Sequence, residues 1–211
     1  GSSEYSVYSH GQYYGNDDLQ SETSRSYELG YEVYGQDTLF KTAIFSTQLE
    51  NMITGQYIGD VYPYGPSMAI SGYKYINVAK AIIKGFETEI EYNLNVNHVL
   101  NVNYTHIKTE DESTGNELYF KPKNTANVGL SSKFAYAISS YISANYIGTQ
   151  YNSSDEKVSG YTTFNAQFSK KIYENLTARI GVDNITDKEF DEGEPYYLKR
   201  RFAYIGLNYK F

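Results

Sequence analysis

Residues 196–211, YYLKRRFAYIGLNYKF, carry the clearest structural signal in the sequence. Their side chains alternate between apolar and polar, which is the pattern of a β-strand whose successive side chains point to opposite faces. One face carries Ala203, Ile205, Leu207, Tyr209 and Phe211, and the other carries Arg200, Tyr204, Gly206, Asn208 and Lys210. The alternation predicts an amphipathic strand, and the fold class depends on how often the rest of the chain repeats it.

The composition is acidic, rich in tyrosine and poor in long apolar runs. The chain has 211 residues, 25 of them tyrosine, no cysteine, no tryptophan, a formal charge of −7 and a mean hydropathy of −0.56. The acidic balance argues against a nucleic-acid partner, because phosphate binding needs clustered Lys and Arg. No apolar run approaches the ~18 residues of a transmembrane helix, whereas strands of ~9–11 residues that are apolar on one side span a bilayer at low mean hydropathy. Abundant tyrosine is typical of the aromatic girdles at membrane interfaces.

Ten strands are predicted, and the connections between them alternate between short and long. The short connections lie near 36–37, 95–97, 135–137 and 174–175, and the long ones at 15–23, 52–73, 110–118, 152–159 and 188–195. Short periplasmic turns and longer extracellular loops are typical of outer-membrane β-barrels. We therefore predict an all-β fold, a transmembrane antiparallel up-and-down β-barrel with about ten strands in this chain. The strands are placed at 4–14, 24–35, 38–51, 74–94, 98–109, 119–134, 138–151, 160–173, 176–187 and 196–211.

The polar faces of these strands are too rich in charged and amide side chains for a soluble core. Asn101 and Asn103, for example, alternate with Leu100, Val102 and Tyr104. Such groups are costly to bury without partners, whereas a water-filled lumen accommodates them. A soluble antiparallel sheet with its polar face in water is the alternative. The charged side chains predicted to face the lumen are Glu28, Glu32, Glu87, Glu89, Glu91, Arg179 and Arg200.

Five segments, in order along the chain, resemble TonB-dependent outer-membrane receptors of the siderophore and colicin receptor type. They are DLQSETSRSYELGY at 18–31, YINVAKA with GFE between 75 and 87, PKNTAN at 122–127, VDNITDKEF at 182–190 and RRF at 200–202. Each segment alone is a weak signal, but five at plausible spacing across nearly the whole chain are a strong one. The resemblance covers only the C-terminal half of such a barrel.

The resemblance implies a bacterial outer-membrane location and, in a parent receptor, ferric-siderophore uptake driven by TonB. Such receptors close about 22 strands around a plug, whereas residues 1–211 are expected to form barrel only, without a plug domain. The chain is then either the C-terminal part of a receptor or a small barrel derived from one. The alternative function is a standalone ten-stranded barrel, acting as a narrow pore or a structural scaffold. Closure of that barrel would require residues 4–14 to pair with 196–211.

The candidate ligand site is the tyrosine-rich connection around residues 55–75. Tyr rings stack on planar catecholates and their hydroxyls donate hydrogen bonds, so this loop could contact a ferric siderophore. The alternative is that some of the rings belong to an aromatic girdle at the membrane interface and the others pack against each other within the loop. The tyrosines concerned are Tyr57, Tyr62, Tyr64, Tyr73 and Tyr75.

Other predicted contacts concern the lumen, the last strand and the membrane. In the family, lumenal charges contact the plug, whereas in a small closed barrel the glutamates would pair with Arg25, Arg179 and Arg200 and block the lumen. An amphipathic last strand ending in Phe resembles the C-terminal strand by which outer-membrane barrels are recognised and inserted. Its residues Leu207, Tyr209 and Phe211 are therefore candidate contacts of the barrel-assembly machinery. Outer-membrane lipid and lipopolysaccharide are the remaining expected partners.

The sequence offers little support for catalysis, a metal or a cofactor. His106, followed by Glu110 and Asp111, is the only histidine expected near the extracellular rim, and no serine, cysteine or metal constellation accompanies it. The acidic run at 187–194 lacks the glycine-punctuated spacing of a calcium loop, which makes solvation or lipopolysaccharide bridging the better interpretation. We predict neither an enzyme nor a cofactor.

Overall fold

A computed structural model describes most of the chain. The residues described are 12–63, 65–66, 69–78, 80–152, 156–189 and 200–210. Most of the predicted strand at 4–14, together with Tyr64 and Phe211, lies outside the described residues.

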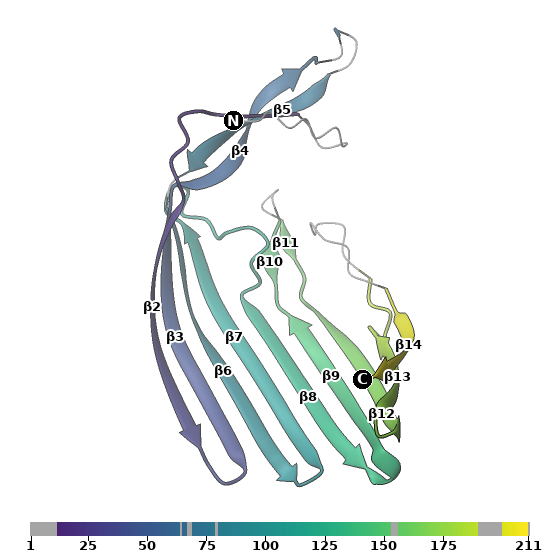
Figure 1. Ribbon diagram of the computed structural model, residues 1–211. Helices are drawn as coiled ribbons and strands as arrows, with labels where there is room; N and C mark the ends of the chain where they lie inside the picture. The colour runs from purple at the N-terminus through teal and green to yellow at the C-terminus, as the bar shows by residue number, and fades with distance from the viewer. Residues whose placement is uncertain are drawn as a thin grey trace. The chain divides into compact units, whose positions relative to one another are not determined.

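The described strands form one large antiparallel sheet and two small ones (Figure 1). The nine strands of the large sheet follow the order β14-β13-β12-β9-β8-β7-β6-β3-β2, and the neighbours from β14 to β7 pair antiparallel. No helix among the described residues is long and apolar enough to cross a membrane. The strands are β2 (Thr23–Tyr34), β3 (Thr38–Glu50), β6 (Ala81–Asn95), β7 (His98–Asp111), β8 (Asn124–Phe134), β9 (Ile138–Ile147), β12 (Tyr161–Tyr173), β13 (Leu176–Asp183) and β14 (Phe202–Tyr209).

Tight turns join the strands at one end of the large sheet, as predicted. The turns fall at 35–37, 96–97, 135–137 and 174–175, and Figure 1 shows all four at the same end. The third is a 3₁₀ turn, η1 (Ala135–Ala137), with Tyr136 at φ 58° and Ala137 at φ 55°. Short turns can close because antiparallel neighbours need only a few residues between them. The short connections of the sequence analysis are therefore confirmed.

Two small sheets lie in the long connections. The first contains β1 (Gln12–Tyr14), β4 (Met52–Val61) and β5 (Ile70–Val78), and the second contains β10 (Gln150–Tyr151) and β11 (Lys157–Val158). One strand is predicted at 74–94, but β5 ends at Val78 and β6 begins at Ala81. A loop is predicted at 52–73, although β4 pairs with β5 from Met52–Val78 to Val61–Ile70.

The first strand also differs from the expectation. β1 pairs in parallel with β5, with Tyr13 opposite Tyr73. Among the strands that the structure describes, β14 has β13 as its sheet neighbour and lies at one end of the strand order. The described part of the first strand therefore pairs with β5 in the small sheet. Closure of a ten-stranded barrel would instead have required it to pair with the last strand.

The large sheet has one apolar and one polar face. On the apolar face Val102 is opposite Val128, and Leu130 is opposite Ile142. Much of this face is open, with Ile205 83% exposed. The buried hydrophobic side chains among the described residues are only Ala43, Ala81 and Val158. A soluble sheet would bury its apolar face in a core, whereas an apolar face that stays open suits contact with lipid.

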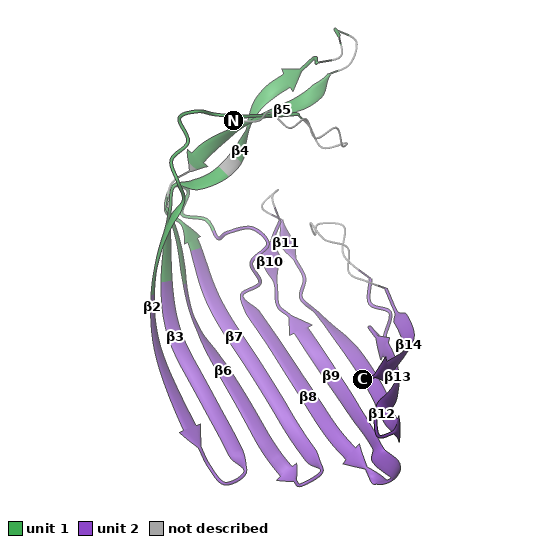
Figure 2. Cartoon of the chain, in the orientation of Figure 1, with its two compact units in different colours: residues 1–26, 47–83, 110–116 green, residues 27–46, 84–109, 117–211 purple. Residues whose placement is uncertain are grey.

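The chain divides into two compact units, which Figure 2 colours separately. Unit 1 comprises residues 1–26, 47–83 and 110–116, and its described part includes the three-stranded sheet. Unit 2 comprises residues 27–46, 84–109 and 117–211, and it includes β8, β9, β12, β13 and β14.

Candidate functional site

Four tyrosine rings gather on one face of the three-stranded sheet in unit 1. Tyr57 is opposite Tyr73 in the β4–β5 register, and Tyr75 follows two residues later on the same face of β5. Tyr13 of β1 stacks on Tyr73 and on Tyr75, with ring centroids 5.0 and 5.4 Å apart. The Tyr57 ring meets Tyr73 edge-on, with centroids 5.8 Å apart. We call these four residues the tyrosine cluster.

A glycine makes room for the cluster. Gly55 is opposite Tyr75, and a Cβ at position 55 would come within 2.7 Å of the Tyr13 ring. The Tyr13 ring therefore occupies the space that a side chain at 55 would fill. Tyr13 was not among the predicted ligand residues, because a parallel pairing between residues about sixty positions apart leaves no local pattern in the sequence.

The cluster offers aromatic faces and phenol hydroxyls to solvent. Tyr13 is 46% exposed and Tyr57 is 55% exposed. The Tyr57 hydroxyl donates a hydrogen bond to Asp60 Oδ1 at 2.8 Å, and this bond raises the pKa of Tyr57. Of the remaining predicted tyrosines, Tyr62 is exposed just beyond the end of β4, and Tyr64 lies outside the described residues.

The polar face of the large sheet carries an acidic cleft within unit 2. The cleft has a volume of about 420 Å³. Lys41 Nζ lies 3.4 Å from Glu32 Oε1, so one lysine partly offsets the acidic charge. We call this site the acidic cleft. Its polar lining includes Glu28, Glu32, Lys41, Thr42, Glu87, Glu89, Asn103 and Thr105.

The other predicted lumenal charges lie apart from the cleft. Glu91 follows Glu89 on the same face of β6, beyond the residues that line the cleft. The Arg179 side chain lies against Gly206 of β14, where a Cβ would be 3.3 Å from Arg179 Cγ. Arg200 precedes β14 and pairs with acidic residues of the β13–β14 connection. Of the seven predicted residues, four glutamates line the cleft, and Glu32 forms the ion pair with Lys41.

Toward β14 the polar face carries Arg179 among amide and hydroxyl side chains. Asn127 Nδ2 donates to Asn145 Oδ1 between β8 and β9, and Asn165 Nδ2 donates to Ser143 Oγ between β12 and β9. The Tyr204 hydroxyl donates to Gln167 Oε1 at 3.1 Å. This part of the face offers amides and hydroxyls, in contrast to the carboxylates of the acidic cleft.

The last described strand presents the expected apolar residues. Leu207 is opposite Ala178 of β13 and is 72% exposed. Tyr209 is opposite Leu176 and is 54% exposed. Phe211, the third residue of the predicted insertion signal, lies outside the described residues.

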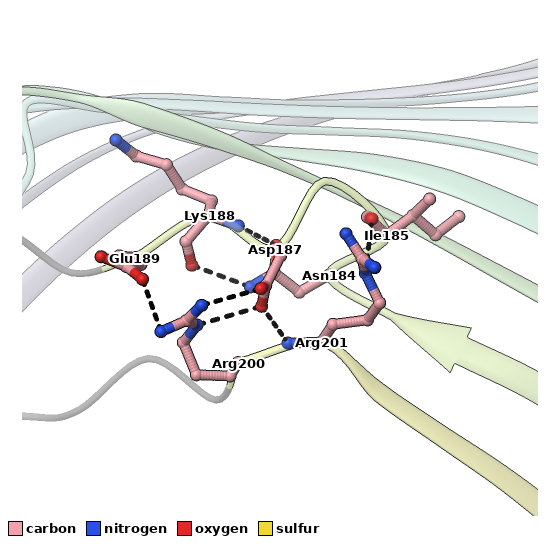
Figure 3. A network of polar contacts seen from close by, with 7 residues as sticks. All are labelled: Asn184, Ile185, Asp187, Lys188, Glu189, Arg200 and Arg201. Carbon is pink, nitrogen blue, oxygen red and sulfur yellow. Dashed lines mark hydrogen bonds and ion pairs between the residues drawn. The ribbon is translucent and has the colours of Figure 1, made fainter.

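A polar network joins the end of β13 to the start of β14 (Figure 3). Arg200 Nε and Nη2 donate to Asp187 Oδ1 and Oδ2 at 3.0 and 2.7 Å, which is a bidentate ion pair. The backbone N–H of Arg201 also donates to Asp187 Oδ1, at 2.8 Å. Arg200 Nη1 forms a second ion pair with Glu189.

The surroundings of Asp187 stabilise its ionised form. The hydrogen bonds from the Arg200 guanidinium, and after them the bond from the Arg201 backbone N–H, hold the pKa of the Asp187 carboxyl well below its usual range. The sequence pattern places Asp187 in an acidic run and Arg200 on the lumenal face. Their pairing was not predicted because the two residues are thirteen positions apart, which is too far for a local motif.

The predicted rim histidine is part of a side-chain network. His106 Nδ1 lies 2.8 Å from Asn124 Oδ1, and the Tyr104 hydroxyl donates to the same oxygen at 2.7 Å. The His106 ring also lies 5.7 Å from the Phe86 ring, between centroids. Within the described residues, no group of three or more His, Cys, Asp or Glu is placed to hold a metal ion.

Comparison with known families identifies one clear match. The sequence profile described as TonB dependent receptor-like, beta-barrel matches residues 3–185. This segment extends from the first residues to the end of β13, so it includes both the tyrosine cluster and the acidic cleft.

Individual relatives agree with the profile. The chain is 27% identical over 188 residues to the Ferrienterobactin receptor of Escherichia coli K12, a match that covers 82% of this chain and 25% of that protein. It is 28% identical over 204 residues to the Vitamin B12 transporter BtuB of Vibrio vulnificus, which covers 93% of this chain and 31% of the transporter. The chain thus spans between a quarter and a third of the length of these curated relatives.

A solved structure shows the same fold. A mutant of the ferric enterobactin receptor PfeA from Pseudomonas aeruginosa, in complex with enterobactin, superposes with a TM-score of 0.76 at 24% identity. The superposition covers 96% of this chain and 34% of that receptor.

Proposed function

The chain belongs to the TonB-dependent receptor-like β-barrel family, and we propose that it forms the C-terminal part of a receptor barrel that takes up ferric siderophores. The large sheet is part of a β-barrel of the bacterial outer membrane, and its open apolar face suits contact with lipid. The observation that carries the proposal is the family match over residues 3–185, within which an exposed tyrosine cluster lies outside the large sheet. Relatives of this type are receptors and transporters, and enzymatic activity forms no part of the proposal.

The tyrosine cluster is the proposed ligand surface. A ferric catecholate presents flat aromatic rings and anionic oxygens, which match stacking faces and phenol donors. Tyr57, Tyr73 and Tyr75 supply these groups together with Tyr13, and Tyr62 and Tyr64 extend the same tyrosine-rich connection. The name of the Escherichia coli relative, a ferrienterobactin receptor, favours an iron chelate over other cargo.

The acidic cleft is the proposed contact with the plug of the parent receptor. Its four glutamates and single lysine give a negative surface, which complements a partner that carries arginine or lysine. Glu91, Arg179 and Arg200 are assigned to the lumen by the sequence pattern alone. Energy coupling through TonB would act on the plug, so this chain would contribute the wall of the transport path.

The membrane contacts proposed from the sequence concern the last strand and the lipid. Leu207 and Tyr209, with Phe211, would form the signal that the barrel-assembly machinery reads. Lipid and lipopolysaccharide would cover the apolar face. The pairing of β1 with β5 favours a segment of a larger barrel over a standalone ten-stranded pore, because it draws the described part of the first strand away from β14.

The proposal is tested by uptake in cells. The full-length receptor that contains this chain is expressed in cells whose outer membrane lacks other catecholate receptors. Uptake of iron-labelled ferric enterobactin is then measured in cells with and without TonB. We expect uptake that requires TonB. Absence of iron uptake combined with TonB-dependent uptake of cyanocobalamin would contradict the assigned substrate class.

Variants of the tyrosine cluster test the ligand surface. Tyr75→Ala removes a ring that stacks on Tyr13, and we expect it to weaken ferric enterobactin binding about threefold to tenfold. Tyr75→Phe keeps the ring and should retain most of the binding. Tyr14→Ala is the matched control, because Tyr14 is opposite Lys74 and lies on the other face of the same small sheet. Equal loss in both alanine variants would argue against the cluster as the ligand surface.

A further inference from the structure

The connection between β13 and β14 begins with a turn that is anchored on the sheet. Asn184 is 4% exposed, its backbone N–H donates to Asn165 Oδ1 of β12, and Ile185 N–H donates to the Phe164 carbonyl of β12. The Asn184 side chain also bonds the backbone of Lys188 in both directions, at 2.9 Å each. These bonds fix the position of the turn, and with it Asp187, relative to the residues of β12.

The backbone of this turn favours the residues that occupy it. Asn184 has φ 50° and Asp187 has φ 54°, in the left-handed region that Asn and Asp tolerate better than other side chains. Asp187 N–H donates to the Asn184 carbonyl at 2.8 Å and closes the turn. The Asp187 carboxylate then faces Arg200 and Arg201, which directly precede β14 (Figure 3).

The apolar face of β14 does not by itself fix the register of the strand. Alternation excludes a slip by one residue, since that would turn every side chain to the wrong face, but a slip by two residues preserves both faces. Ala203, Ile205 and Leu207 are opposite Val182, Ile180 and Ala178, so a two-residue slip would still place aliphatic beside aliphatic. The connection from 184 to 201 is also too long for turn geometry to fix the register, unlike the tight turns at the other end.

We propose that Asp187 is a positioning residue that fixes the register of the C-terminal strand through Arg200 and Arg201. The Arg201 N–H that binds Asp187 belongs to the residue immediately before Phe202, the first residue of β14. A slip by two residues would carry this N–H about 7 Å along the strand, out of hydrogen-bonding range. The guanidinium of Arg200 holds the carboxylate by two bonds, and Arg201 Nε donates to the Ile185 carbonyl at 2.9 Å as a further tie to the same turn.

The register of β14 determines which residues of β13 lie opposite Leu207 and Tyr209. The positioning role of Asp187 follows from the contacts within this chain and from the outer-membrane barrel, and it does not rest on the proposed ligand. The register measurement below can therefore fail while ferric enterobactin uptake succeeds, or the reverse.

The test reads the register directly by disulfide formation. The chain has no cysteine, so pairs of introduced cysteines report the strand alignment of the intact polypeptide in the outer membrane. Arg179→Cys with Gly206→Cys reports the native register, because these positions are opposite each other. Arg179→Cys with Asn208→Cys, and Thr177→Cys with Gly206→Cys, report the two possible two-residue slips. Diagonal positions lie ~7–8 Å apart, too far for a disulfide without a slip.

Asp187→Asn is the decisive variant, since Asn keeps the size and the tolerance for positive φ while losing the charge. We expect the native disulfide to fall at least about twofold and one slipped disulfide to appear. Glu189→Gln is the matched control, because it removes the second ion pair of Arg200 and leaves every bond of Asp187 in place. An unchanged native disulfide in Asp187→Asn would overturn the proposal.

A second variant covers the case in which Asp187→Asn does not reach the outer membrane. Arg200→Gln keeps the Asp187 carboxylate and its hydrogen bond from the Arg201 N–H. It removes the guanidinium group that orients the carboxylate by two hydrogen bonds. We expect a slipped disulfide in this variant, at a lower yield than in Asp187→Asn. If the assembled Arg200→Gln protein shows only the native disulfide, the proposal is wrong.

Discussion

Glycine at position 85 is required by the close approach of its neighbours in the sheet. A Cβ there would collide with the His106 backbone carbonyl, and it would lie 2.9 Å from the Phe45 ring. We expect Gly85→Ala to destabilise the folded barrel by about 1–3 kcal/mol, because a backbone atom cannot move aside as the tip of a flexible side chain can. The measurement is the urea midpoint of the barrel in detergent.

Gly30→Ala provides the control for this prediction. Gly30 is also inside a strand of the large sheet, but the nearest atom to a Cβ there is the Thr42 carbonyl oxygen at 3.8 Å, an ordinary contact. We expect its urea midpoint to stay close to that of the wild type. Equal shifts in both variants would point to the general conformational effect of replacing glycine and not to the contact at position 85.

The Asp187 carboxyl should resist protonation. Its pKa in the folded protein is held below the usual value by Arg200 and by the Arg201 N–H. For such a group, the stabilising contribution is complete above the unfolded pKa of about 3.9 and is lost as the pH falls through the lower folded pKa. We expect the carboxyl resonance of labelled Asp187 to remain that of the ionised form at pH 4. Arg200→Gln should move the midpoint upward, and a wild-type midpoint near 4 would contradict the prediction.

At the scale of elements, the period-two alternation was sufficient to predict most of the large sheet. Strands β7, β8, β12 and β13 alternate cleanly, and each falls within or close to its predicted range. The division into β5, which ends at Val78, and β6, which begins at Ala81, was not predicted because residues 80–84, KAIIK, do not alternate. Pattern analysis detects how one strand divides its faces, and it carries no information about where a strand ends when the faces are mixed.

The candidate site was less predictable than the strands that support it. Glu28, Glu87 and Glu89 could be placed on one face from their spacing, and the structure brings them to one cleft. Lys41 pairs with Glu32 across the tight β2–β3 turn. The meeting of Glu28 with Glu87 and Glu89 depends on β3 lying between β2 and β6, and the strand pattern does not predict that order. The place of Tyr13 in the tyrosine cluster likewise depends on a pairing between distant residues, which only the folded chain reveals.

At the scale of the whole molecule, the sheet has two ends that need neighbours. β2 and β14 end the strand order, and within the described residues β1 supplies neither with a partner. Unpaired backbone N–H and C=O groups are costly in a bilayer, so spanning sheets close into barrels. The two ends therefore favour further strands of the same polypeptide, in agreement with relatives of which this chain spans a quarter to a third.

This reasoning predicts the size of the natural protein. Serum raised against the last strands should detect, in the outer membrane of the source organism, a polypeptide about three times the 24.0 kDa of this chain or somewhat larger. Such a size leaves room for the additional strands and for a plug opposite the acidic cleft. A species near 24 kDa would instead require the chain to close on itself, with the missing neighbours of β2 and β14 supplied by each other. The resulting lumen would be barely wider than its own side chains, and uptake of a large ferric chelate through it would be excluded.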